Sequence, residues 1–371
     1  MRIALTILLA FHGTIHLLGF VGWSRLAAVP GLSGRTLVSL SASGQRAYAL
    51  VWLVATLVLL AAAALCAGRH AWWWATALLG VLLSQCLIVL AWDDARFGTI
   101  VNVLVLVPAL VGLAHAHFTR RTDAEIRVLL ARSSPPSTTS VSQSELQNLP
   151  APVRRWLESS GVVGHERLRT VRLRQRGELR TSPSDAWMPA RADQYFSVDP
   201  PAFVWRVDTA MMGVLPLAGR NMLVKALSLI NVVDSADEKI DHSSLLRFLG
   251  ETVWFPSAAL APYIVWEPID EMTARATMRQ GGLDASAVFT FSDQGRVLGL
   301  SAERYLGGGA SAKLTPWFVS CSEWRTFQGI EIPNRGQVSW TLASGDFTYY
   351  RWEILDVEFN RSELYGGGAR L

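Results

Sequence analysis

Four apolar stretches in the first 118 residues constrain this chain more than any other feature. They cover residues 3–23, 48–68, 72–92 and 99–118, and they contain almost no charged side chains. About 20 helical residues, at about 1.5 Å each, cross a hydrocarbon core of about 30 Å. The sequence therefore predicts a multi-pass integral membrane protein with a four-helix transmembrane domain at residues 1–118. The first stretch is too long for the apolar core of a signal peptide, so we expect it to be retained.

The arginines that flank the four stretches bear on orientation. An even number of spans places both chain ends on one side of the membrane. Basic residues near the spans are divided almost evenly between the two sides, with a slight excess, which includes Arg120 and Arg121, on the side of the chain ends. The positive-inside rule thus leans by a small margin toward the cytoplasmic face of the inner (plasma) membrane for the C-terminal part.

Residues 119–144 are predicted to be a flexible linker. Its centre reads Ser-Ser-Pro-Pro-Ser-Thr-Thr-Ser over residues 133–140. Such a composition buries no apolar area and does not sustain a helix. We therefore expect a separate soluble domain at residues 145–371.

The soluble domain has the two-residue period of half-buried strands. Apolar and polar residues alternate at 170–176, 203–208, 273–279, 287–291, 338–342 and 347–357. Turn signals such as Gly281-Gly282 and Asn334-Arg335-Gly336 lie between such runs. These features predict an α+β domain built on a curved antiparallel β-sheet, a half-barrel-like meander.

One segment, residues 241–262, interrupts this rhythm. Asp241 can cap a helix that carries Leu245, Leu246, Phe248 and Leu249 on one side, and Ser257 can cap a second helix. A helical pair inserted in a long meander should lie on one face of the sheet. We therefore predict a helical lid over a concave surface.

Composition excludes several classes of protein. The net charge is +4, and the arginines are spread along the chain without a basic cluster among aromatics, so we expect no nucleic-acid partner. Cys321 is the one cysteine of the soluble part, which therefore has no internal disulfide. Phosphate-loop, dinucleotide, nucleophile-elbow and zinc-site motifs are absent from the sequence, and we expect no cofactor. The sequence identifies no protein partner.

Several motifs of the soluble part resemble those of an uncharacterised bacterial membrane-anchored family, a domain of unknown function. The most specific is the block Trp254-Phe255-Pro256, which is followed by Ala259-Leu260. The others are Gln194-Tyr195, Pro201-x-Phe-x-Trp205, Ala302-Glu-Arg304-Tyr305, Ile332-Pro-x-x-Gly336 and Gly345-Asp-Phe-x-Tyr349. In strand order the domain also looks like the half-barrel fold of periplasmic lipoprotein carriers. That second resemblance implies a concavity for acyl chains, by analogy of fold alone.

Two histidines in the first span are candidate metal or haem ligands. His12 and His16 are four residues apart and share one face of a helix. Ionisable residues inside a membrane are functional candidates. The alternatives are hydrogen bonds to neighbouring helices, which we favour, and proton transfer.

Glu251 and Arg304 are the candidate catalytic residues of the soluble domain. Glu251 stands beside Trp254 and Phe255, where burial would raise its pKa enough for acid or base chemistry. The alternative, which we favour, is a structural ion pair with Arg304 as the partner.

The sequence as a whole favours a membrane-anchored module that binds a lipid or another lipophilic small molecule at the bilayer. The sheet carries more aromatic residues than a short helical pair should cover. The predicted ligand-binding residues are Trp205, Trp254, Phe255, Tyr305 and Trp340. Two alternatives are an enzyme that acts on a membrane-derived substrate with Glu251 and Arg304, and a redox or transport domain based on the histidines.

Overall fold

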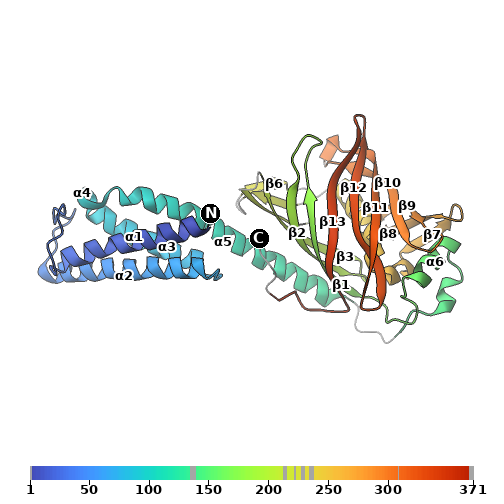
Figure 1. Cartoon of the computed structure of the whole chain (residues 1–371), viewed down its shortest axis with the longest axis horizontal. Coiled ribbons are helices and arrows are strands. Elements are labelled where there is room, and N and C mark those ends of the chain that lie inside the picture. The colour runs from blue at the N-terminus through green and yellow to red at the C-terminus, as the bar shows by residue number, and fades with distance from the viewer. Residues whose placement is uncertain are drawn as a thin grey trace. The chain divides into compact units, whose positions relative to one another are not determined.

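The chain forms two compact units, Met1–Thr119 and Arg120–Leu371. A computed structural model describes residues 2–133, 139–211, 215–220, 223–226, 230–233, 238–307 and 309–366 (Figure 1). Each unit has its own hydrophobic core.

The first unit is a bundle of helices. Its elements are α1 (Arg2–Trp23), α2 (Ala42–Ala67), α3 (Trp73–Leu90), the short α4 (Trp92–Ala95) and the first part of α5 (Gly98–Arg132). The four longer helices are long and apolar enough to cross a membrane. Small residues allow close helix contacts, since a Cβ atom built at Gly19 would lie 2.4 Å from the ring of Trp52, and one at Gly80 would lie 2.6 Å from Leu59.

Helix α5 differs from the prediction. It continues to Arg132, so residues 119–132, which we expected in the linker, are helical. Ile126, Leu129 and Leu130 form an apolar stripe with helical spacing, and this stripe packs on Tyr195 and Val204 in the second unit. Burial of that stripe stabilises the extension. Residues 134–138 of the predicted linker lie outside the described residues.

The second unit is built on one antiparallel sheet, as predicted. Its strands follow the order β6-β5-β4-β3-β2-β1-β13-β12-β11-β10-β9-β8-β7. The strands are β1 (Thr170–Leu179), β2 (Met188–Ser197), β3 (Ala202–Met211), β4 (Leu215–Arg220), β5 (Leu223–Ala226), β6 (Ile230–Val233), β7 (Ile264–Pro268), β8 (Thr273–Gln280), β9 (Leu283–Phe291), β10 (Val297–Leu306), β11 (Lys313–Phe327), β12 (Ile330–Leu342) and β13 (Gly345–Phe359). All neighbours except β1 and β13 are consecutive in the chain, so the sheet is a meander in two halves joined by that pair.

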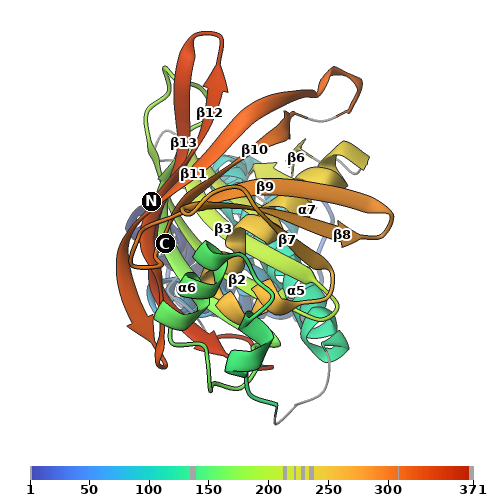
Figure 2. The ribbon, with the colours of Figure 1, turned by 90° about the vertical axis from the view of Figure 1, so that its right-hand side faces the viewer.

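The inner face of the sheet carries the core and most of the helical elements. The helical elements that follow α5 in the chain are η1 (Gln143–Leu146), α6 (Ala151–Ser159), α7 (Glu238–Glu251), η2 (Thr252–Trp254), η3 (Pro256–Leu260) and η4 (Gly309–Ser311). Helix α7 lies within the curve of the sheet (Figure 2). Leu246 and Leu249 of α7 are fully buried in the same cluster as Phe196, Phe289 and Trp317 of the strands. The predicted helical insert is therefore present, with 3₁₀ turns in place of its second helix.

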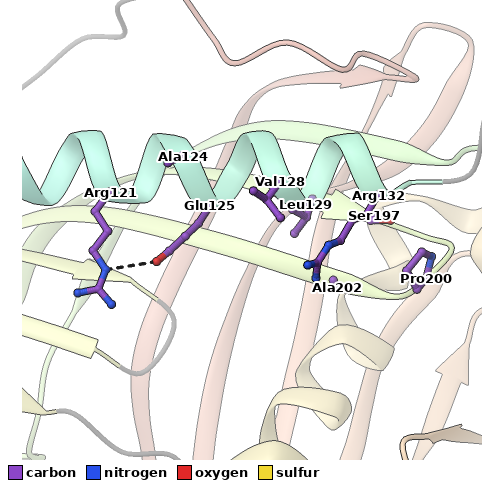
Figure 3. A pocket seen from close by; sticks show the side chains of 9 residues that line it. All are labelled: Arg121, Ala124, Glu125, Val128, Leu129, Arg132, Ser197, Pro200 and Ala202. Atoms are coloured by element: carbon purple, nitrogen blue, oxygen red, sulfur yellow. Dashed lines mark ion pairs between the residues drawn. The ribbon is translucent and has the colours of Figure 1, made fainter.

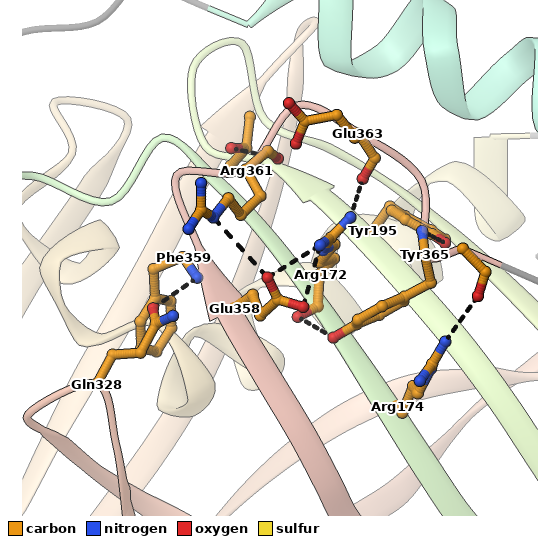
Figure 4. Close-up of polar contacts among 11 residues, drawn as sticks. Arg172, Arg174, Tyr195, Gln328, Glu358, Phe359, Arg361, Glu363 and Tyr365 are labelled. Carbon is orange, nitrogen blue, oxygen red and sulfur yellow. Dashed lines mark hydrogen bonds and ion pairs between the residues drawn. The ribbon is translucent and has the colours of Figure 1, made fainter. Parts of the chain in front are cut away.

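The outer face is covered near β1 and β2 by the end of α5 and by the C-terminal segment. Arg172 of β1 donates to both carboxylate oxygens of Glu358, at 3.0 and 2.9 Å, and lies under the ring of Tyr365. The Tyr365 hydroxyl donates to the Arg172 carbonyl at 3.0 Å, and the Tyr365 backbone N–H donates to the Tyr195 hydroxyl at 3.1 Å (Figure 4). These bonds hold residues 361–366 against the sheet.

Candidate functional site

The polar residues of the inner face meet beside α7. Gln175, Gln194 and Trp205 face inward on β1, β2 and β3, because Gln194 pairs with Trp205 and lies two residues from Ala192, the partner of Gln175. Arg247 and Glu251 come from the last turn of α7. This group, together with Tyr350 of β13, is called the Glu251 network below.

The carboxylate of Glu251 is fixed by two donors. Arg247 Nε donates to Oε1 at 2.8 Å, and Gln194 Nε2 donates to Oε2 at 2.7 Å. The Glu251 side chain is 13% exposed. Burial raises the pKa of Glu251, while the Arg247 charge and the two hydrogen bonds oppose that rise.

The network continues through two amides and ends at a phenol. Gln175 Nε2 donates to Gln194 Oε1 at 3.1 Å, and the Tyr350 hydroxyl donates to Gln175 Oε1 at 2.9 Å. Each amide thus donates with its nitrogen and accepts with its oxygen, which is a consistent assignment of both side chains. The result is an unbroken chain of hydrogen bonds from Tyr350 to Arg247 across three strands and a helix.

The ion pair that we expected between Glu251 and Arg304 is replaced by the pair with Arg247. Arg247 and Glu251 are four residues apart on one helix, where such side chains are neighbours. This spacing was visible in the sequence. Gln194 lies 57 residues from Glu251 in the sequence, and no spacing or motif indicates that the two side chains are in contact.

Arg304 lies elsewhere on the inner face, among aromatic rings. Its Cζ atom is 5.0 Å from the ring centre of Trp317 and 5.7 Å from that of Trp340. Its Nη1 donates to the Tyr349 hydroxyl at 3.2 Å. Trp317 Nε1 donates to the same hydroxyl, and the Tyr349 ring stacks on Trp340.

Two side chains from the start of α7 contact Tyr305, the residue that follows Arg304 in β10. The His242 ring is 5.5 Å from the ring of Tyr305, and Lys239 Nζ lies 5.5 Å from the centre of that same ring. Burial and the charge of Arg304 lower the pKa of His242, which favours the neutral imidazole. Arg304, Tyr305, Tyr349, His242 and Lys239 are called the Arg304 cluster below.

The predicted ligand-binding aromatics fall into two groups. Trp254 and Phe255 are 4% and 0% exposed and pack in the core, and Trp340 is 7% exposed. Trp205 and Tyr305 are only partly buried. Phe203, Tyr349 and Tyr350, which the prediction did not include, are partly buried too. Trp254 and Phe255 would contact a ligand only after the helical cover moved.

Most of the second unit matches a known family. Residues 139–352 match the family described as a family of unknown function, DUF6544. The chain belongs to this family. The DUF6544 match includes every residue of the Glu251 network and the Arg304 cluster, and it confirms the expectation that the C-terminal part belongs to a family of unknown function.

Comparisons with curated proteins and with solved structures give two further findings. No curated protein matches the chain. Among solved structures, the chain is similar to the crystal structure of LolA superfamily protein NE2245 from Nitrosomonas europaea, at 12% sequence identity and a TM-score of 0.31, over 60% of this chain and 95% of that chain. Similarity at this level says nothing about a ligand or an activity.

A groove of about 440 Å³ lies on the outer face of the DUF6544 region, between the end of α5 and the turn from β2 to β3. Val128, Leu129, Pro200 and Ala202 form its apolar walls (Figure 3). Its polar groups come mainly from α5, where Arg121 Nε lies 3.5 Å from Glu125 Oε1, and from Arg132. A groove of this volume is large enough for a small ligand, so it competes with the inner face as a binding site.

The histidines of α1, His12 and His16, lie outside the DUF6544 match and belong to a separate polar network in the bundle. His12 Nε2 lies 2.8 Å from Asn102 Oδ1, and His16 Nε2 lies 2.8 Å from Ser84 Oγ. Asn102 Nδ2 donates to Gln85 Oε1 at 3.0 Å. Because His16 Nδ1 lies 2.8 Å from the His12 carbonyl, which can only accept, that nitrogen carries the proton.

These contacts bear on the predicted metal or haem site. No group of three or more His, Cys, Asp or Glu that could hold a metal ion occurs among the described residues. The ring nitrogens of His12 and His16 face Asn102, Ser84 and a carbonyl. The arrangement is that of polar residues that connect helices in an apolar bundle.

Proposed function

We propose that this protein is a membrane-anchored binding module for a lipid or another lipophilic ligand, held on the inner face of the DUF6544 sheet. The first unit is the anchor, in the inner (plasma) membrane. The observation that carries the proposal is a group of partly exposed aromatics on the inner face. Phe203, Trp205, Tyr305, Tyr349 and Tyr350 are only partly buried there, whereas Phe255 and Phe289 are fully buried.

The burial of these aromatic side chains is incomplete. Large aromatic side chains contribute most when fully removed from water, at roughly 25 cal/mol for each Å² of apolar surface. Helix α7 packs mainly on β8, β9 and β10, and its Arg247 lies over the rings of Phe203 and Trp205. An apolar ligand would complete this burial, while the Glu251 network keeps α7 in place beside it.

A photoreactive acyl probe tests the proposal on the full chain in membranes. A fatty acid that carries a diazirine in its chain would be crosslinked by light, and labelled peptides would be located by mass spectrometry. We expect label on peptides that contain Trp205 or Tyr349 and Tyr350, with competition by unlabelled fatty acid. Label confined to the first unit would refute binding on the sheet.

Two variants separate the inner face from the outer groove. The partly buried aromatics Phe203, Trp205, Tyr305, Tyr349 and Tyr350 are called the aromatic wall. Trp205→Ala removes part of it and should reduce labelling of the inner face. Ala202→Trp fills the groove beside Val128 and Leu129 and should leave inner-face labelling unchanged. The opposite pattern would assign the ligand to the groove.

A further inference from the structure

We propose that the Arg304 cluster binds the anionic head group, a carboxylate or a phosphate, of an acyl-chain amphiphile whose apolar part lies along the aromatic wall. This inference rests on the proposed function and adds the chemical class of the ligand. It is carried by an arginine with an unused donor, by the absence of a carboxylate partner for that arginine among the described residues, and by the groups around it.

The first observation is the donor inventory of Arg304. A guanidinium has five N–H donors in a planar fork. In this structure Nη1 donates to the Tyr349 hydroxyl, while Nε is buried and has no hydrogen-bond partner. The Trp317 and Trp340 rings stabilise the positive charge through their faces, but they do not replace an oxygen acceptor. A buried donor of this kind requires an acceptor, and carboxylate and phosphate oxygens are the acceptors that match the fork.

The second observation is the missing counter-ion. Other arginines of the sheet have carboxylates within hydrogen-bond distance, as Arg172 has Glu358 and Arg206 has Asp193. Within the described part of the chain, Arg304 makes no ion pair. Glu251 is near enough for the charge of Arg304 to affect its pKa, but both of its oxygens are bonded to Arg247 and Gln194. Among the described residues, no carboxylate is bonded to Arg304 in the way that Glu251 is bonded to Arg247.

The third observation is the pair of basic groups from α7. Lys239 Nζ donates to the Ala312 carbonyl and adds a second positive charge beside Tyr305. His242 lies against the same ring, and its Nδ1 is buried without a partner. Lys239 and His242 thus adjoin Tyr305, the residue that follows Arg304 in β10. An anion bound there would gain charge-assisted hydrogen bonds in a site that is partly shielded from water.

The aromatic wall would contact the apolar chain of the ligand. Tyr349, which accepts from Arg304, stacks on Trp340 and is followed in β13 by Tyr350. Tyr350 meets Trp205 edge to face at 6.2 Å. A ligand with its head group at Arg304 would therefore lay its apolar chain toward Trp205. This is the arrangement expected for an amphiphile, with charge recognised at one end and area buried at the other.

The test compares head groups on the full chain in membranes. Four photoreactive acyl probes share one chain and differ at the end: a carboxylate, a phosphate monoester, a methyl ester and an alcohol. We expect either the carboxylate or the phosphate probe to label the inner face at about tenfold lower concentration than the two neutral probes. The better of the two anions identifies the source as a free fatty acid or a phosphorylated lipid.

Variants connect this preference to Arg304. Arg304→Gln should weaken labelling by the preferred anionic probe about tenfold and leave the neutral probes unchanged, and Arg304→Lys should retain part of the preference. Arg279→Gln is the control, because Arg279 is an exposed arginine of β8 that pairs with Asp284. Protection of the buried Cys321 thiol from alkylation confirms that each variant is folded.

Each outcome decides something. Equal labelling by anionic and neutral probes would overturn the head-group inference while binding on the inner face stands. If Arg304→Gln reduced labelling by all four probes equally, Arg304 would support the structure of the aromatic wall and would not recognise the charge of the head group. Absence of inner-face label from every probe would refute the proposed function and this inference together.

Discussion

Replacing Gln194 by methionine tests whether the Glu251 network stabilises the inner face. Methionine keeps the length and approximate shape of glutamine but neither donates nor accepts a strong hydrogen bond. The variant leaves Glu251 Oε2 without its 2.7 Å donor and Gln175 Nε2 without its 3.1 Å acceptor. Gln194 is 0% exposed and Gln175 is 2% exposed, so water does not reach these groups in the native state.

The magnitude follows from two orphaned polar groups. A buried group that loses its partner costs about 1–3 kcal/mol, and more when it is charged. Two such groups, partly offset by the apolar side chain, predict a loss of about 2–5 kcal/mol. For a unit of this size, each kcal/mol lowers the unfolding midpoint by about 2–4 °C, which gives a decrease of roughly 5–15 °C.

Cys321 supplies the assay. It is buried in β11, and burial raises the pKa of its thiol to about 12, so alkylation at neutral pH requires opening of the sheet. In a full-chain background with Cys66 and Cys86 replaced by alanine, alkylation against temperature reports on the second unit alone.

Gln337→Met is the matched control for this experiment. Gln337 is an exposed residue of β12, so its replacement should change stability by no more than about 0.5 kcal/mol. Equal midpoints for Gln194→Met and the wild type would refute the claim that the network holds α7 to the sheet.

Three further predictions concern single contacts. Burial raises the pKa of Glu251, so the contribution of Glu251 to stability is complete below pH 4.5, its ordinary pKa, and is lost as the pH rises through the pKa of the folded state. Relative to the wild type, Glu251→Gln should therefore gain stability between pH 4 and pH 8. Hydrogen exchange of α7 would measure this gain. Asn102→Leu should destabilise the helical bundle by about 1 kcal/mol, because it removes the acceptor of His12 and the donor to Gln85, and steric trapping in bicelles would detect this. Tyr365→Leu removes the hydroxyl that donates to the Arg172 carbonyl, so it should speed hydrogen exchange in residues 361–366 without changing that of β13; unchanged exchange would contradict the role of that hydroxyl.

The fold was predictable wherever burial follows the period of the backbone. The four long helices and strands such as β8 and β13 show that period in full. Strand β2 does not, because its inward positions are Ala190, Ala192, Gln194 and Phe196, and only the last is strongly apolar. Gln194 faces inward because α7 supplies Glu251 as its partner, and no local pattern shows a contact of that kind.

The candidate site was predictable in part for a similar reason. Glu251 and Arg304 do lie on the inner face, yet each has a different partner from the one expected. The choice between Arg247 and Arg304 depends on how the last turn of α7 meets β2. The extension of α5 was missed because charged residues on its exposed side conceal the stripe of Ile126, Leu129 and Leu130.

The pairing of β1 with β13 has a consequence for biosynthesis. Val171 faces Phe359 across this pair, so the centre of the sheet cannot form until almost the whole chain has left the ribosome. Strands β1 to β6 and β7 to β13 each pair with their neighbours in the chain and can form earlier as two half-sheets with open edges. Bringing β1 and β13 together closes a long loop, which is slow. Proteins with such non-local strand pairing fold late, and their incomplete sheets are prone to aggregation until pairing is complete. We therefore expect the nascent protein to depend on chaperones until its last strand is made.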